Sequence, residues 1–130
     1  MHIDDVREWF LIADQDFDSA NFLTKMYPKP IEIICYHCTQ AVEKYLKGFL
    51  EYNDVVPEKT HNLSYLLDRC IEINDIFKAI LKECDFINRF TTNIRYIHRK
   101  EITETDVEYV LKFTIKIKNF ASFLKIRDAL

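Results

Sequence analysis

The sequence predicts an all-helical protein, and three observations carry that prediction. Apolar residues recur at spacings of three and four along most of the 130 residues, which is the period of an α-helix. One glycine and three prolines offer few of the tight turns that β-hairpins need. A chain of this length with 48% hydrophobic residues suits a single domain with one core, spanning 1–130. We expect an up-and-down bundle of four long or medium helices plus a short fifth.

The first helix is expected to begin at Asp4 or Asp5, whose carboxylates can cap free backbone N–H groups. It should end near Met26, before two closely spaced prolines. Leu11 and Phe22 fall on the side opposite the core, which suggests a second contact surface. The core face consists of Val6, Trp9, Phe10, Ala13, Phe17 and Ala20.

The second helix is expected to run from about Ile31 to Tyr52, because Pro30 suits a first turn where its missing N–H costs nothing. Its apolar positions are Ile31, Ile34, Cys35, Cys38, Val42, Tyr45, Leu46 and Phe49. Four polar side chains fall within a narrow sector on another side, and we call them the polar stripe. They are His37, Gln40, Lys44 and Lys47.

Residues 53–60 are expected to form a loop before a short third helix and a fourth. Asn74 and Asp75 separate these two helices. The apolar positions of the third are Leu63, Leu66, Leu67, Cys70 and Ile71. Those of the fourth are Ile76, Phe77, Ile80, Leu81, Cys84 and Ile87.

The helical pattern lapses between Asn88 and Lys100, so this stretch is expected to be a loop or a frayed turn. Thr103 and Asp106 then resemble a capping box that opens a last helix running to about Asp128. Apolar side chains spread further round this helix than a surface helix needs, which indicates a central position or a subunit interface. We therefore expect a homodimer.

Several classes of protein are excluded on the sequence. No apolar run approaches the roughly 18 residues of a membrane span, and the first residues lack the features of a signal peptide, so we expect a cytoplasmic protein. The four cysteines should then be reduced thiols. Cys35 and Cys38 point into the predicted core while His37 points elsewhere, so we expect no metal site. No phosphate-binding glycine loop is present, and we expect no bound cofactor.

Charge is distributed unevenly along the chain, whose formal net charge is −3. Residues 1–27 carry two basic and six acidic side chains, whereas residues 86–130 carry nine and five. A basic final third could contact phosphates, or it could neutralise the acidic first helix inside the bundle. Both readings stay open on the sequence.

The segment 36–50, which reads YHCTQAVEKYLKGFL, resembles the signature of the HEPN family. In that signature an aromatic residue and a histidine precede Gln-Ala-x-Glu-Lys-x-Leu-Lys on the second long helix. Three other pieces match in the expected order: Ala13 to Phe17 with Ala20, Thr60 to Leu63, and Ile94 to Tyr96. The resemblance therefore covers nearly the whole chain.

The resemblance implies a helical bundle that is usually dimeric and often acts beside a minimal nucleotidyltransferase, as in toxin–antitoxin pairs. Some relatives cut RNA with an arginine, four to six intervening residues and then a histidine. Here two residues separate Arg95 from His98, and eight separate Arg89 from His98. Because the arginine and the histidine must reach one cleft, the departure from this spacing argues against ribonuclease activity.

The candidate ligand-binding residues lie in three places. The polar stripe offers two cations, an amide and an imidazole that suit a nucleotide, although a solvated helix face is the alternative. Arg95 and Tyr96 suit phosphate contact and base stacking. His61, at the start of the third helix, suits either a nucleotide or a packing role.

Asp16 is expected to have a structural role, as part of an ion pair between the first two helices. It lies at the edge of the apolar face of the first helix, where a carboxylate needs a partner, and Lys44 or Lys47 could supply one.

Three functions remain open on the sequence. We favour a non-catalytic HEPN module that binds a nucleotide or a nucleotidyltransferase partner. The alternatives are a dimeric, metal-independent endoribonuclease that uses Arg95 and His98, and a domain that only binds a protein partner.

Overall fold

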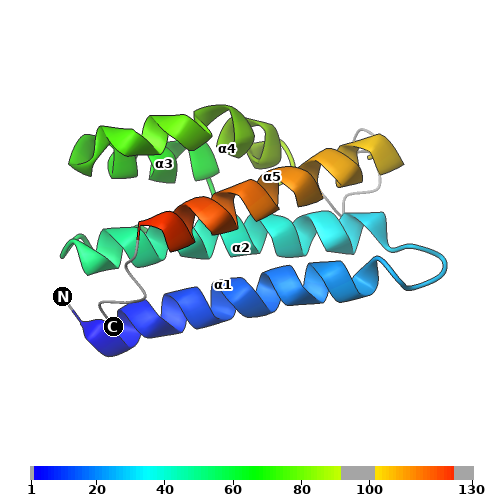
Figure 1. Ribbon diagram of the computed structural model, residues 1–130, viewed down its shortest axis with the longest axis horizontal. Helices are drawn as coiled ribbons and strands as arrows, with labels where there is room; N and C mark the ends of the chain where they lie inside the picture. Colours follow the sequence, from blue (N-terminus) through cyan, green and yellow to red (C-terminus); the bar gives the residue numbers. More distant parts are fainter. Residues whose placement is uncertain (1, 92–101, 125–130) are drawn as a thin grey trace.

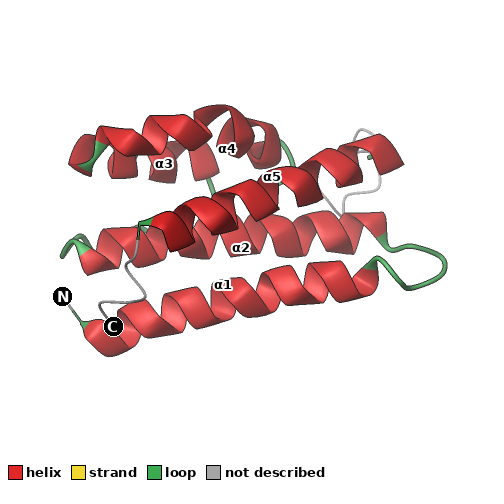
Figure 2. Cartoon of the chain, viewed as in Figure 1, coloured by secondary structure: helices red, strands yellow, loops and turns green. Residues whose placement is uncertain are grey.

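The computed structural model describes residues 2–91 and 102–124, and every regular element among them is a helix (Figures 1 and 2). Helices α1 and α2 form a long antiparallel pair, and α3 and α4 lie on the far side of α2 from α1 (Figure 1). Helix α5 packs along α2 and completes the bundle (Figure 1). The elements are α1 (Ile3–Leu23), α2 (Ile31–Tyr52), α3 (Leu63–Ile73), the 3-10 helix η1 (Asp75–Ile80), α4 (Leu81–Asn88) and α5 (Glu104–Phe123). The predicted all-helical bundle is confirmed.

Helix α2 is the central element of the core. It contacts α1, α3, α4 and α5, and most of its side chains between Ile34 and Leu50 are buried. Close packing against α1 depends on Gly48, because a Cβ placed there would lie 3.2 Å from both Phe10 Cζ and Trp9 Cβ. The single glycine of the chain thus allows two helices to pack closely and does not form a turn.

Helices α3 and α4 form an antiparallel pair that Asn88 ties together at one end. Its side-chain oxygen accepts a hydrogen bond from the Leu63 backbone N–H at 2.7 Å. Its amide nitrogen donates to the side chains of Asn62 and Ser64, each at 3.2 Å. The end of α4 is therefore fixed to the beginning of α3.

The bounds of α2 and the start of α5 agree with the sequence, whereas those of α1 differ. Helix α2 spans the predicted residues, and the predicted capping box of Thr103 and Asp106 opens α5, with hydrogen bonds of 3.0 and 3.1 Å. Helix α1 begins at Ile3 after His2, with no side-chain cap, so the predicted capping by Asp4 or Asp5 is wrong, because both residues lie inside the first turn. The helix ends at Leu23, three residues before the predicted end. Residues beyond 124, where the last helix was predicted to continue, lie outside the described part of the chain.

The predicted fourth helix differs most, because its first part is the 3-10 helix η1. The side chain of Asn74 accepts a hydrogen bond from the Ile76 N–H and opens this tighter turn. The changed period turns Ile76 and Leu81, both predicted as core residues, partly to solvent. None of the described helices combines the length and the apolar character that a membrane-spanning segment needs.

Candidate functional site

The polar stripe of α2 faces α1 along one side of the helix pair. Two groups of charged side chains occupy this side, and each is built around one carboxylate that lies between a histidine and a lysine. The first centres on Asp16 of α1, and the second centres on Glu43 of α2. We call them the Asp16 cluster and the Glu43 cluster.

In the Asp16 cluster, two residues of the polar stripe bind the carboxylate of α1. His37 Nδ1 lies 3.2 Å from Asp16 Oδ1, and Lys44 Nζ lies 3.3 Å from Asp16 Oδ2. Lys44 also donates a hydrogen bond to Gln40 Oε1 at 2.7 Å. Asp16 and Lys44 are largely buried, whereas the His37 side chain keeps 28% exposure. The cluster joins α1 to α2 and leaves the imidazole accessible from one side.

In the Glu43 cluster, the carboxylate and the lysine are both buried. Lys47 Nζ donates to Glu43 Oε2 at 3.1 Å across one helical turn, and it also lies 5.7 Å from the centre of the Trp9 ring. His61 Nδ1 lies 2.6 Å from Glu43 Oε1, while the His61 side chain is 70% exposed. A buried ion pair is thus capped by an imidazole from the segment that precedes α3.

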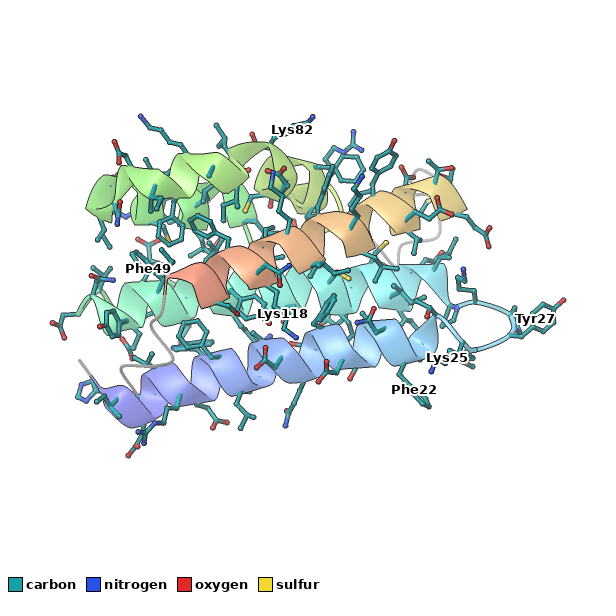
Figure 3. The ribbon with its side chains drawn as sticks, in the orientation of Figure 1. Phe22, Lys25, Tyr27, Phe49, Lys82 and Lys118 are labelled. Atoms are coloured by element: carbon teal, nitrogen blue, oxygen red, sulfur yellow. The ribbon has the colours of Figure 1, made fainter. Side chains whose placement is uncertain are left out.

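An open groove of about 540 Å³ lies beside the Asp16 cluster. It is lined by Asp18, Ser19, Phe22, Leu23 and His37. Phe22 is 73% exposed, and Figure 3 shows its side chain pointing away from the bundle near the end of α1. The groove combines an aromatic ring, a hydroxyl, a carboxylate and a fixed imidazole.

The predicted ligand-binding residues therefore separate into different surroundings. His37 lines the groove, Gln40 and Lys44 belong to the Asp16 cluster, and Lys47 is buried. His61 stands apart on the Glu43 cluster. Arg95, Tyr96 and His98 lie outside the described residues.

Sequence reasoning found the position of Asp16 but missed the second carboxylate. The pairing of Glu43 with His61 joins residues that no sequence spacing connects. The hydrogen bond from Tyr45 Oη to Asp14 Oδ1 at 2.6 Å was also missed. The acidic residues of the first helix and the lysines of the second are the sequence feature that could have indicated ion pairs between these two helices.

The four cysteines are buried thiols in the core. Burial raises the pKa of Cys35, Cys38 and Cys70 to about 12, and it raises the pKa of Cys84 as well. Such thiols are poor nucleophiles and poor metal ligands at neutral pH. Among residues 2–91 and 102–124, no group of three histidine, cysteine or carboxylate side chains is placed to hold a metal ion.

Comparison with known proteins identifies a family and solved structures of similar fold. The family model described as the HEPN domain matches residues 6–124. The comparison with curated proteins gave no match.

The crystal structure of ST0689, described as an archaeal HEPN homologue, has a TM-score of 0.72 and 23% identity, and the match covers 92% of this chain and 96% of that one. The crystal structure of TT1696 from Thermus thermophilus has a TM-score of 0.78 and 21% identity, covering 90% and 95%. At such identity the two structures show a shared fold.

Proposed function

The chain belongs to the HEPN family, and from that premise we propose that it is a non-catalytic HEPN module that binds a nucleotide beside His37. The observation that carries the proposal is the groove of about 540 Å³ between the end of α1 and α2. Its size lies within the roughly 300–1,000 Å³ of small-ligand sites.

The groups in the groove suit the base and the ribose of a nucleotide. Phe22 offers a ring face for stacking, and Ser19 and Asp18 can accept hydrogen bonds from ribose hydroxyls or base amino groups. Asp16 holds His37 through one ring nitrogen, which orients the other ring nitrogen for a ligand.

Calorimetric titration with ATP, GTP and their monophosphates tests this proposal. We expect one of them to bind, and we expect His37→Ala and Phe22→Ala to weaken binding at least about tenfold, as loss of a well-placed contact does. Leu11→Ala is the matched control, because Leu11 is an exposed apolar residue of α1 that does not line the groove. Absence of binding to any of the four nucleotides would contradict the proposal.

Partner binding is the second part of the proposed function, and exposed apolar side chains favour it. Leu11, Phe22, Met26 and Tyr27 expose 53%, 73%, 55% and 96% of their surfaces along α1 and the turn after it. Figure 3 shows Phe22 and Tyr27 pointing outward at this end. Apolar groups gathered in this way mark protein contacts. We propose that this surface contacts a second copy of the chain or a minimal nucleotidyltransferase.

Sedimentation separates these two partners. A species of twice 15.6 kDa that reverts to 15.6 kDa in Phe22→Asp would support the homodimer. A monomer that co-purifies with a nucleotidyltransferase would support the two-component complex. RNA cleavage that disappears in His98→Ala would instead show an endoribonuclease and overturn the non-catalytic assignment.

A further inference from the structure

The groove beside His37 offers a free carboxylate to a ligand. Its described lining residues are Asp18, Ser19, Phe22, Leu23 and His37, and none of them is a lysine or an arginine. Asp18 is exposed, and among the residues that the structure describes no side chain pairs with its carboxylate. The carboxylate can therefore accept hydrogen bonds from a ligand without giving up a partner of its own.

The lysines near the groove do not offset this negative charge. Lys44 Nζ lies 3.3 Å from Asp16 Oδ2 and donates to Gln40 at 2.7 Å, so its charge is already paired in the Asp16 cluster. Lys25 lies near the same end of α1 (Figure 3), but it does not line the groove. A phosphate in the groove would meet the Asp18 carboxylate and would find no lysine or arginine among the described lining residues. The lining therefore suits the base of a nucleotide better than its phosphates.

Asp18 and Phe22 are arranged so that one base could contact both. They are four residues apart on α1, which places them on one face of the helix and one turn from each other. The Cα–Cβ bond of Phe22 is tilted toward the N-terminus of the helix, which is the direction of Asp18. A base stacked on the exposed Phe22 ring would therefore present one of its edges to the Asp18 carboxylate.

We propose that the groove selects guanine, with the base stacked on Phe22 and its N1–H and N2 amino groups bound by Asp18. An ionised carboxylate only accepts hydrogen bonds, and its two oxygens can accept a pair of them side by side. Guanine presents two neighbouring N–H donors on its Watson–Crick edge. Adenine and cytosine each present one donor beside a ring-nitrogen acceptor, and uracil presents one donor between two carbonyls. The inference rests on the proposed function and names the base that this site takes.

Calorimetric titration with GMP, inosine monophosphate and AMP tests the selectivity. GMP should bind at least about fivefold tighter than inosine monophosphate, which lacks the N2 amino group, because a bidentate contact to a base discriminates by about that factor or more. AMP, which has an acceptor at N1, should also bind at least about fivefold more weakly than GMP.

Asp18→Asn should remove the preference for GMP over inosine monophosphate. The substitution replaces one carboxylate oxygen with an amide NH2 group, which would face the guanine amino group as a second donor. Asp4→Asn is the matched control, because Asp4 is another carboxylate of α1, has a side chain that is 97% exposed and does not line the groove. This control variant should keep the preference of the unmodified protein.

The phosphates give a second measurement. GTP should bind no tighter than GMP, because its two additional phosphates find no lysine or arginine among the described lining residues. Tighter binding of GTP would show that the phosphates are recognised and would overturn the proposal. A preference for GMP that Asp18→Asn leaves intact would overturn it as well.

Failure of this inference is distinguishable from failure of the proposed function. If GMP, inosine monophosphate and AMP bound equally and Phe22→Ala weakened all three, the groove would be a nucleotide site and only its selectivity for guanine would be wrong. If none of the three bound, the proposed function and this inference would both be wrong.

Discussion

His61 Nδ1 lies 2.6 Å from the buried carboxylate of Glu43, 18 residues earlier in the chain. The same carboxylate pairs with the buried Lys47. The Glu43 side chain of α2 therefore neutralises the buried Lys47 ammonium and also binds the segment that leads into α3.

Glu43→Gln is expected to destabilise the protein strongly. The substitution keeps the shape of the side chain but leaves the Lys47 ammonium buried without a counter-charge, which costs about 3 kcal/mol or more in free energy of unfolding. Urea denaturation followed by circular dichroism measures this. Glu72→Gln is the control, because its ion pair with Arg69 is exposed and should contribute less than about 1 kcal/mol. Equal midpoints for the two variants would contradict the expectation.

Asp16→Ala is expected to weaken the link between α1 and α2. Removal of this carboxylate leaves Lys44 and His37 without their shared partner, at a cost of about 2 kcal/mol. The control is Asp4→Ala, whose side chain is 97% exposed and lies 3.8 Å from Arg7, so its loss should change stability by less than about 0.5 kcal/mol. A shift in thermal midpoint as small as that of the control would show that the Asp16 cluster contributes nothing.

Gly48→Ala is expected to lower stability by about 1 kcal/mol, although alanine favours helix formation. The added methyl group would press against Phe10 and against the Trp9 Cβ, which cannot move without α1 itself. Asn119→Ala, at an exposed position of α5, should instead raise stability by a few tenths of a kcal/mol. A stabilised Gly48→Ala protein in urea denaturation would mean that α1 moves away easily.

The thiols are expected to resist modification in the folded protein. Cys35, Cys38 and Cys70 have pKa values of about 12, so almost no thiolate is present at pH 8. A colorimetric thiol reagent should react slowly with the native protein and with all four cysteines in urea. Rapid reaction of one thiol without denaturant would place that cysteine outside the core.

The same raised pKa values predict loss of stability at alkaline pH. An unfolded thiol ionises near its ordinary value of 9.0, whereas the folded thiols retain their protons to about 12. The folded state therefore binds more protons in that interval. Stability should be unaffected by these groups below about pH 9 and should fall as the pH rises toward 12. Thermal midpoints across this range, with Cys38→Ala as a comparison, measure the effect.

Most of the fold could be predicted from the sequence because each long helix carries its own period and end signals. Pro30 and Asn53 bound α2, and Thr103 opens α5. The prediction of the fourth helix was wrong in its first part. There the Ile76 N–H donates a hydrogen bond to the Asn74 side chain and begins a 3-10 turn, which the spacing of apolar residues does not indicate.

The candidate site was less predictable, because a helical period shows which side chains share a face but not what covers that face. The polar stripe of α2 was compatible with solvent or with a ligand, yet much of it lies against α1 through Asp16. The pairing of Glu43 with His61 depends on the path of residues 53–62, which no local pattern determines.

The central place of α2 has a consequence for the motions of the protein. A helix covered on several sides can expose its backbone amides to deuterium only when the whole bundle opens. Amides between Ile34 and Leu50 should therefore exchange last, at the rate of global unfolding. The α1 turns around Phe22 border an open groove and should exchange through smaller local openings, so the surface proposed to receive ligands should exchange before the core of α2 does.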